Sequence, residues 1–527
     1  MGKTLKKQRK QAAKAAEEEA AKSGGVSGGN NVLAVIAKRL KYKLPANPKK
    51  KIKLTPLITE ALNAHAWDDA ATLLGVLEKA QDAGGEGVEI PKLGAVMRWV
   101  RAADLAGTEA IAAKLLAGVM RVAAGPQPHP AAAVPAVPAA RAEGEGGEEH
   151  EDGAAKAAIP VRRFPPWVGP PAAEGINPPP QGGDAEGGEG AGAKALGPYK
   201  GRFGVVPLPP EYAGTNTNAS TAPNPVAGAA AGTTALPHIA KDLKMYCTEP
   251  GTIQWADNAS RPPVQRVEVP HVPGAFCLVG ALSRHECAQI IACAEEMGYT
   301  VDPDYVMSAS ARAGAAGAGV SAHNASAARN GGSGGGERGA AGCVWLADES
   351  LQGPLYERVA HLLPQRLCGG DLAGLNCRWR LYRYDKGSVY RPHVDGAWPG
   401  SGIKDGKYEF DAFGDRWSRL TFLVYLNDGF EGGCTTYYTP AQPGSGACLE
   451  AHSVKPVCGN IMVFPHGDTM GSLVHEGAAV TSGSKYVIRT EVLYKLAPGV
   501  TAGGAGAPQA AMPVPVPFKR RDGAAKA

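Results

Sequence analysis

Two histidines and an aspartate constrain the fold of this chain more than any other feature. His393 and Asp395 are separated by a single residue, and His475 follows much later in the sequence. Two imidazoles and one carboxylate can occupy one face of an octahedral metal ion and leave three positions open, an arrangement that suits non-haem Fe(II) chemistry with O2. The interval from His393 to His475 leaves room for several strands and hairpins. The pattern therefore predicts a metal site enclosed by a rolled-up β domain.

A second pair with the same spacing, His466 and Asp468, competes for the ligand role. The only histidine downstream of this pair is His475, which follows after little more than one strand and a turn. A closed site needs ligands from different strands, so the sequence favours His393, Asp395 and His475. His466 is interpreted as a hydrogen-bonded structural histidine. Burying Asp395 without a cation would be costly, which also favours its role as a ligand.

Strand and turn patterns surround the three candidate ligands. An aromatic-rich segment, residues 380–390, leads into His393. An apolar run over residues 419–427 predicts a buried strand, and a glycine-rich turn follows it. A second apolar run, residues 461–464, precedes His475. This alternation of apolar strands and glycine turns predicts an all-β domain.

Three motifs follow one another in the C-terminal half of the chain. They read Arg383-Tyr384…Gly387…Tyr390…His393-Val394-Asp395, then Tyr425-Leu426-Asn427 with Gly432-Gly433-Cys434-Thr435, and then His475-Glu476-Gly477…Val480…Gly483-Ser484-Lys485. In order and spacing they resemble the core of the Fe(II)/2-oxoglutarate-dependent dioxygenases, in the prolyl 4-hydroxylase-like branch. The resemblance covers roughly residues 267–496. It implies a double-stranded β-helix, or jelly-roll, catalytic domain with flanking helices.

The resemblance also implies a set of bound groups. It implies that His393, Asp395 and His475 hold Fe(II) and that 2-oxoglutarate is the co-substrate, with ascorbate as a further candidate cofactor. Lys485 and Tyr384 match the family positions that hold the distal carboxylate of 2-oxoglutarate.

A second cation competes with Lys485 for this carboxylate. Period-two alternation places Lys485 and Arg489 on the same face of one strand, so either side chain could hold it. Lys485 is preferred because it follows Gly483 in the family register. Arg489 would then contact the primary substrate.

By resemblance, the reaction is hydroxylation of an aliphatic C–H bond, coupled to conversion of 2-oxoglutarate into succinate and CO2. A prolyl residue of a protein or peptide is the leading substrate. One alternative is a nucleic-acid demethylase of the same fold, which would need base-stacking aromatic residues in a basic groove, and the sequence does not indicate one. The other is a catalytically silent sensor that binds 2-oxoglutarate and iron. Intact candidate ligands and Lys485 argue against a silent sensor.

Two segments upstream of the motifs extend the resemblance. Ser283 and Glu286 have the spacing of a capping box and predict the start of a helix. Arg329-Asn330 and Glu337-Arg338 resemble a short R-N-x-x-R substrate-side segment that glycines split. This departure from the family pattern leaves the role of Arg338 open.

Composition divides the rest of the chain. With 70 Gly and 43 Pro among 527 residues, and only 6% aromatic residues, the chain cannot pack as one globular body throughout. Residues 123–244 are rich in Ala, Gly and Pro and predict a disordered linker. The same composition predicts a low-complexity insertion at 309–341 and a disordered tail at 498–527. Residues 245–497 are predicted to form the dioxygenase domain.

Residues 54–122 show helical periodicity and predict a small all-α module. Thr55, followed by a proline, predicts the start of its first helix, Pro91 the start of the third and Thr108 the start of the fourth. Such a module would bind a protein partner or, alternatively, cap the dioxygenase domain. The remaining residues, 1–53, are predicted to form a basic, partly helical tail.

Cysteine usage and the absence of a targeting segment predict an intracellular protein. All ten cysteines fall between Cys247 and Cys458 without a C-x-x-C pair, so no zinc site is predicted. No apolar signal segment follows Met1 and no run is long and apolar enough to span a membrane. The sequence therefore predicts a reducing, cytoplasmic or nuclear setting without membrane association. A net charge of +5 is too small to predict nucleic-acid binding.

Overall fold

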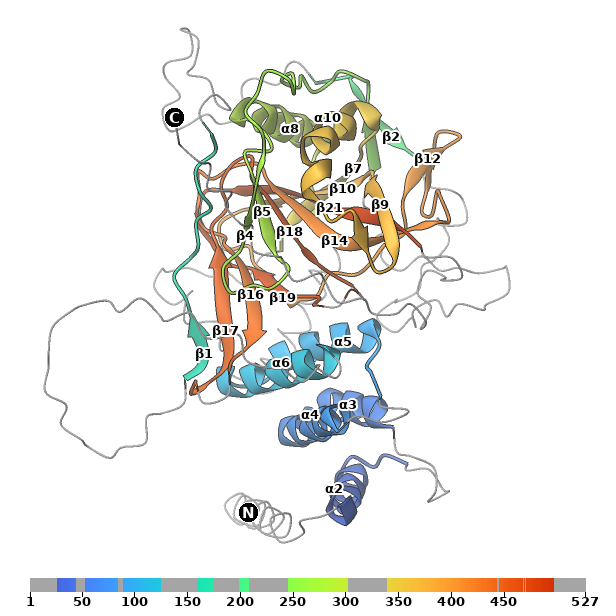
Figure 1. The fold of residues 1–527 in the computed structure, drawn as a ribbon, viewed down its shortest axis with the longest axis vertical. Coiled ribbons are helices and arrows are strands. Elements are labelled where there is room, and N and C mark those ends of the chain that lie inside the picture. The colour runs from blue at the N-terminus through green and yellow to red at the C-terminus, as the bar shows by residue number, and fades with distance from the viewer. Residues whose placement is uncertain are drawn as a thin grey trace, which may run out of the picture. The chain divides into compact units, whose positions relative to one another are not determined.

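The computed structural model describes ten stretches of the chain, and they fall into two compact units (Figure 1). One unit contains the N-terminal helices, the strand at 159–163 and residues 438–451, and the other contains most of the C-terminal half. Each is described by itself. The described residues are 26–43, 53–83, 89–124, 159–173, 199–207, 245–301, 339–442, 445–467, 469 and 471–496.

Helices dominate the described part of the first unit. Amphipathic sequences explain them, because apolar side chains recur with helical spacing and are buried, as Leu57, Leu73, Trp99 and Val119 are. Four helices occupy the region where four were predicted. The helices are α2 (Val26–Arg39), α3 (Leu54–Asn63), α4 (Trp67–Asp82), α5 (Leu93–Asp104) and α6 (Glu109–Ala124).

The start of α3 differs from the prediction. The helix begins before Thr55, and the backbone N–H groups of Leu54 and Thr55 donate to the two carboxylate oxygens of Glu89 at 2.7 and 3.0 Å. A carboxylate from a distant loop thus satisfies the free amides and complements the helix dipole. Thr108 behaves as predicted, because its hydroxyl accepts the N–H of Ile111 at 3.2 Å.

The described residues from 159 onward form β-strands and two longer helices. The helices are α8 (Arg284–Met297) and α10 (Glu349–Val359), with a 3-10 turn at Ala360–Leu362. The strands are β1 (Ile159–Arg163), β2 (Phe203–Val206), β3 (Met245–Thr248), β4 (Gln265–Glu268), β5 (Phe276–Val279), β6 (Thr300–Val301), β7 (Ala341–Leu346), β8 (Arg366–Leu367), β9 (Gly370–Leu375), β10 (Arg378–Tyr384), β11 (Tyr390–His393), β12 (Gly402–Lys404), β13 (Lys407–Glu409), β14 (Arg416–Tyr425), β15 (Glu431–Gly432), β16 (Thr435–Pro440), β17 (Ala447–Val454), β18 (Ile461–Pro465), β19 (Val474–Gly477), β20 (Val480–Ser482) and β21 (Lys485–Lys495).

Two larger sheets carry most of these strands. The five-stranded sheet has the order β1-β17-β16-β19-β11. The twelve-stranded sheet has the main order β2-β3-β7-β10-β21-β14-β18-β5-β4, to which β6, β8 and β9 are added at the side. The small pairs β12-β13 and β15-β20 complete the set. Two such sheets, joined by a chain that alternates between them, agree with the predicted jelly roll.

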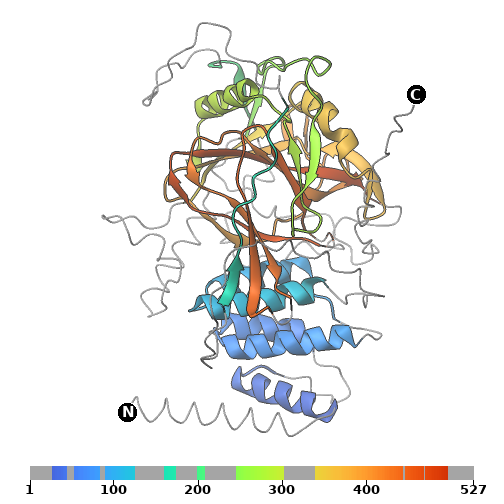
Figure 2. The ribbon, with the colours of Figure 1, turned by 60° about the vertical axis from the view of Figure 1, so that its left-hand side comes forward.

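Two apolar cores lie on opposite faces of the large sheet. One is filled by side chains of both sheets, including Tyr384 and Val487 from the large sheet and Tyr437 from the small sheet. The other joins the large sheet to α8 and α10, which cover one of its faces in Figures 1 and 2. The predicted capping box at the start of α8 is present, with Ser283 and Glu286 in reciprocal hydrogen bonds.

Part of the predicted linker 123–244 is ordered, which corrects the prediction at those residues. β1 pairs in parallel with residues 447–451 of β17. β2 pairs with β3, and the nearby Tyr199 is buried in the core. Each strand lies at the end of a sheet order, where an edge offers free backbone partners to a short extended segment. Average composition conceals such segments because they need few apolar side chains.

The other predicted low-complexity segments lie largely outside the described residues. This holds for the tail 498–527 and for most of the insertion 309–341. The end of the insertion is ordered, because Ala340 is buried and Ala341 begins β7. Among the described residues, no helix is long and apolar enough to cross a membrane. All ten cysteines are described, and each is a free thiol.

Candidate active site

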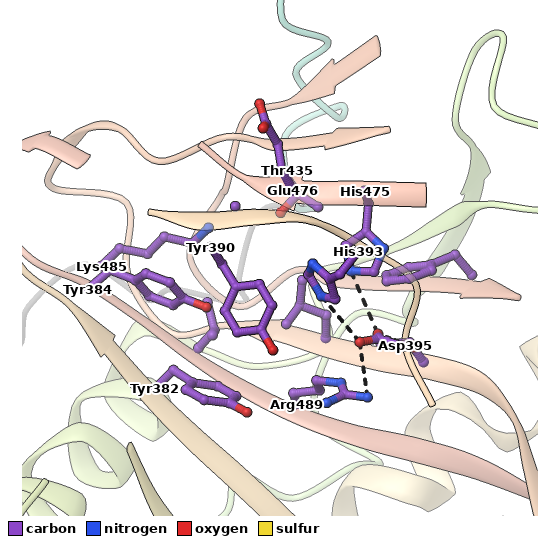
Figure 3. Close-up of a pocket in the computed structure, with 15 residues that line it drawn as sticks. Tyr382, Tyr384, Tyr390, His393, Asp395, Thr435, His475, Glu476, Lys485 and Arg489 are labelled. Atoms are coloured by element: carbon purple, nitrogen blue, oxygen red, sulfur yellow. Dashed lines mark hydrogen bonds and ion pairs between the residues drawn. The ribbon is translucent and has the colours of Figure 1, made fainter. Parts of the chain in front are cut away.

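The structure brings the three predicted metal ligands together at one end of a pocket between the two sheets (Figure 3). His393 ends β11 and lies directly opposite His475 of β19 in the antiparallel register. Asp395 follows two residues after β11. Its Oδ1 lies 3.4 Å from His393 Nε2, and its Oδ2 lies 3.7 Å from His475 Nε2. One possible metal-ligand atom from each of the three residues lies within 4.8 Å of the other two.

Backbone carbonyls fix which nitrogen of each histidine faces the centre. His393 Nδ1 lies 2.8 Å from the carbonyl oxygen of Arg391, and His475 Nδ1 lies 3.2 Å from that of Leu473. A carbonyl oxygen can only accept, so each Nδ1 carries the proton and each Nε2 presents its lone pair. Burial, helped by His393, lowers the pKa of His475 to about 3 and keeps this imidazole neutral. His475 is therefore in the form that binds a metal, and His393 directs its Nε2 to the same centre.

Asp395 is ionised and held at both of its oxygens. Its side chain is only 2% exposed, and burial by itself would raise its pKa. The Arg489 guanidinium, whose Nη2 lies 3.0 Å from Oδ1, is the largest influence that opposes burial and holds the pKa of Asp395 well below its usual value. The Thr421 hydroxyl donates to Oδ2 at 2.7 Å.

These residues fit a divalent metal ion. Two imidazole Nε2 atoms and one carboxylate oxygen converge, and their backbone and side-chain partners fix their orientation. Within the described part of the chain, no other group of three or more His, Cys, Asp and Glu side chains converges in this way. The donor set matches the 2-His-1-carboxylate arrangement of non-haem Fe(II) sites.

Lys485 lies at the other end of the pocket and has no carboxylate partner among the described residues. It is 3% exposed, and its Nζ donates to the carbonyl oxygen of Gly433 at 2.6 Å. The rings of Tyr384 and Tyr425 flank the ammonium group at 5.4 and 5.7 Å from their centroids. Burial lowers the pKa of Lys485 to about 8. An isolated buried cation is costly, so this end of the pocket fits an anionic ligand.

Gly433 makes room for this lysine. Its φ of +61° is in the region that favours glycine, and a Cβ at this position would lie 3.2 Å from Lys485 Cδ and 2.8 Å from the Phe430 ring. The second glycine of the Gly432-Gly433 motif therefore keeps the anion end of the pocket open and directs its carbonyl at the ammonium group.

The two cations that sequence analysis left in competition have different partners. Lys485 and Arg489 lie on one face of β21, as the alternation predicts, and both line the pocket. Arg489 is paired with Asp395 at the metal end, whereas Lys485 is not paired with a carboxylate among the described residues. In Figure 3 the two ends are clearly separated, with Tyr390 drawn between them.

Sequence reasoning missed several residues of the pocket wall. Thr421 stands inside an apolar run, where one polar residue in a buried strand is the signal that could have revealed it. Thr435, quoted from the sequence only as part of the Gly432-Gly433-Cys434-Thr435 motif, begins β16 and also lines the pocket. Further pocket residues that the sequence did not single out are Tyr382, Leu423, Phe464, Glu476 and Val487. The segment around Arg338 lies outside the described residues.

Comparison with known proteins agrees with this geometry. Residues 379–490 match the family model of the 2OG-Fe(II) oxygenase superfamily. The match spans β10 to β21 and contains both histidines, Asp395 and Lys485. This part of the chain is therefore a domain of the 2OG-Fe(II) oxygenase superfamily. No curated protein is similar enough to the chain to count as a match.

Solved structures show weaker similarity. The viral collagen prolyl hydroxylase from Paramecium Bursaria Chlorella virus-1, in complex with 2OG, is 17% identical over 42% of this chain and 96% of its own, with a TM-score of 0.25. A prolyl hydroxylase from Trichoplax adhaerens, in complex with a hypoxia inducible factor peptide, is 16% identical over 30% of this chain and 63% of its own, with a TM-score of 0.20. Similarities at these TM-scores do not define the substrate of this chain.

Proposed function

We propose that this protein is an Fe(II)- and 2-oxoglutarate-dependent dioxygenase that hydroxylates an aliphatic C–H bond, with a prolyl residue of a protein or peptide as its leading substrate. The observation that carries the proposal is the pairing of two complementary sites in one pocket. A convergent His393, Asp395 and His475 set suits a metal cation, and the unpaired Lys485 suits a carboxylate. The superfamily match supports the same chemistry.

Each residue of the pocket has a distinct task in this proposal. His393, Asp395 and His475 would hold Fe(II), which supplies O2 activation when bound together with 2-oxoglutarate. Lys485 would pair with the distal carboxylate of 2-oxoglutarate, and Tyr384 would help to position it. Because 2-oxoglutarate is a dianion, pairing with Lys485 would remove the cost of the buried ammonium group and fix the direction in which the co-substrate enters.

The surrounding residues prepare the pocket for this chemistry. Arg489 keeps Asp395 ionised, so the carboxylate needs no proton loss before it binds a cation. Phe464 and Val487 are almost completely buried, and they limit access of water to the pocket wall. Exclusion of water strengthens the charge interactions of Lys485 and Asp395 with their ligands.

A prolyl substrate is proposed because the motif order from Arg383 to Lys485 resembles the prolyl 4-hydroxylase-like branch. The experiment that tests the function uses the full chain with Fe(II), 2-oxoglutarate and O2, and measures succinate by mass spectrometry. Proline-rich peptides should stimulate succinate formation and gain one oxygen atom on proline. An N-methylated oligonucleotide provides the comparison. Stimulation by the oligonucleotide alone would replace the prolyl substrate by a nucleic acid, and an absence of succinate with every substrate would contradict the dioxygenase assignment.

A further inference from the structure

A line of buried hydrogen bonds runs from the backbone to the candidate metal ligand Asp395. The N–H of Trp398 donates to Ser418 Oγ at 2.8 Å, and Ser418 Oγ lies 2.9 Å from His466 Nε2. On the other side of the ring, His466 Nδ1 lies 2.8 Å from Thr421 Oγ1, which is 2.7 Å from Asp395 Oδ2. Ser418, Thr421 and His466 are each at most 1% exposed.

The direction of every hydrogen bond in this line can be derived. An ionised Asp395 only accepts, so the single hydroxyl proton of Thr421 points to its Oδ2. Thr421 must therefore accept from His466, which places a proton on Nδ1. Burial lowers the pKa of His466 to about 3, so the ring is neutral and Nε2 accepts the hydroxyl proton of Ser418. The Trp398 N–H then completes the line.

The line orients one oxygen of Asp395 while Arg489 contacts the other. Thr421 has no proton left for another acceptor, and its own lone pair is engaged by His466, so its hydroxyl cannot rotate without breaking two buried hydrogen bonds. Asp395 Oδ1 faces His393 and Arg489. The carboxylate is thereby held in one orientation before any cation arrives.

We propose that Thr421 and His466 are positioning residues that preorganise Asp395 for metal binding. This inference rests on the proposed function, because it assigns a role to residues that support the same site. His466 was interpreted from the sequence as a structural histidine, and both of its ring nitrogens are indeed hydrogen-bonded. The line of hydrogen bonds through His466, however, ends on the candidate metal ligand Asp395. Partners of this kind typically change metal affinity about 10- to 100-fold when they are removed.

The test measures Co(II) affinity of the full chain by anaerobic titration calorimetry, with Co(II) as the probe for the divalent metal. Thr421→Val keeps the side-chain shape and removes the hydroxyl, and should weaken Co(II) binding about 10- to 100-fold. Thr421→Ser restores the hydroxyl and should recover most of the affinity. Thr490→Val is the matched control, because Thr490 is equally buried and donates to the carbonyl of Asn376 instead. It should bind Co(II) as the wild type does.

A second pair of variants tests the histidine separately and does not require that Thr421→Val folds. His466→Asn keeps an N–H donor near the position of Nδ1, whereas His466→Leu removes it. The inference predicts that His466→Asn binds Co(II) more tightly than His466→Leu, with thermal unfolding used to compare the stability of both proteins.

The possible outcomes separate the inference from the proposed function. If Thr421→Val binds Co(II) as tightly as the wild type, the positioning role is wrong and the metal site stands. The same conclusion follows if His466→Asn and His466→Leu have equal affinity for Co(II). If His393→Ala binds Co(II) as tightly as wild type, the metal site itself is wrong. Loss of affinity in Thr421→Val with recovery in Thr421→Ser supports the positioning role.

Discussion

The two ends of the pocket differ in how their charges are balanced. At the metal end, the carboxylate of Asp395 is paired with Arg489 and accepts a hydrogen bond from Thr421. At the other end, the ammonium group of Lys485 contacts a backbone carbonyl and two aromatic rings, and no carboxylate among the described residues pairs with it. The metal end is thus prepared in advance, while the lysine end carries a buried charge that only a ligand can compensate.

This difference predicts which end of the pocket is more sensitive to mutation. The carboxylate and the two imidazole rings are already held by hydrogen bonds, so they lose little conformational freedom when a cation binds, and this favours high affinity. Because no carboxylate in the described part of the chain pairs with Lys485, its buried charge makes the pocket less stable without an anion and more selective for one. Loss of a metal ligand should therefore have the largest effect, and changes around Lys485 should have graded ones.

The first and largest predicted effect concerns the metal end. His393→Ala, Asp395→Ala and His475→Ala should each reduce Fe(II)-dependent succinate formation at least about a thousandfold, because two remaining donors cannot hold the ion. Circular dichroism should show a retained fold. His285→Ala changes an exposed histidine of α8 and should retain full activity. Turnover that survives in Asp395→Ala would contradict the assigned ligand set.

The second prediction compares the two cations of β21. Lys485→Ala should raise the KM for 2-oxoglutarate about 30- to 100-fold, because a buried charge-assisted pair worth about 2–3 kcal/mol is lost. Arg489→Gln should change this KM much less and weaken Co(II) binding instead, since Arg489 contacts Asp395. If Arg489→Gln produces the larger KM effect, Arg489 holds the co-substrate and the comparison between the two ends reverses.

The third prediction uses the lowered pKa of Lys485. Its pKa falls from 10.5 to about 8 because of burial, so the folded protein binds fewer protons here than the unfolded chain between these pH values. The contribution of Lys485 to the stability of the ligand-free protein should therefore increase as pH rises from about 8 to about 10. Binding of 2-oxoglutarate should weaken over the same range, because the neutral amine loses its attraction for a carboxylate.

Thermal unfolding with and without 2-oxoglutarate, measured across this pH range, checks both trends. Lys485→Arg is the informative control, because a guanidinium stays protonated throughout and should make 2-oxoglutarate binding nearly independent of pH between about 8 and about 10. An equally steep pH dependence in Lys485→Arg would assign the titration to another group.

The smallest predicted effect concerns Tyr384. Its ring flanks Lys485 at 5.4 Å from the centroid, and its hydroxyl is proposed to help position the co-substrate. Tyr384→Phe keeps the ring and should raise the KM for 2-oxoglutarate only about three- to tenfold, the amount expected for the loss of one ordinary hydrogen bond of about 0.5–1.5 kcal/mol. Steady-state kinetics should compare the KM for 2-oxoglutarate of Tyr384→Phe with that of Lys485→Ala. An effect as large as that of Lys485→Ala would make the hydroxyl, and not the cation, the main anchor.

Much of the candidate site was accessible from the sequence because its spacing is local or follows a fixed motif order. His393 and Asp395 are separated by a single residue, so they lie close together in any fold, and Lys485 and Arg489 share a face of β21 by strand alternation. His466 was separated from the ligand set by its short sequence distance to His475, and in the structure it lies within hydrogen-bonding distance of Ser418 and Thr421. The superfamily match at residues 379–490 confirms the recognition of the domain.

Other features depended on strands that are distant in the sequence. β1 and β2 form where the edge of a sheet offers free backbone hydrogen-bonding groups. The residues of these short strands do not by themselves indicate that such an edge is present. The backbone N–H groups at the start of α3 are satisfied by Glu89, which lies in a loop far from the helix start in the sequence, and not by the side chain of Thr55. Composition and local propensity do not contain this information.

The sequence by itself determined which residues could bind a metal and a carboxylate, because residue type and motif spacing decide the available chemistry. Only the tertiary structure decided which charged side chains pair with one another. Arg489 pairs with Asp395 and Lys485 is left for a ligand, since partner choice depends on distances between β11, β14, β18 and β21. The same packing connects His466 to Asp395 through Thr421 and gives a histidine outside the ligand set a place beside the metal site.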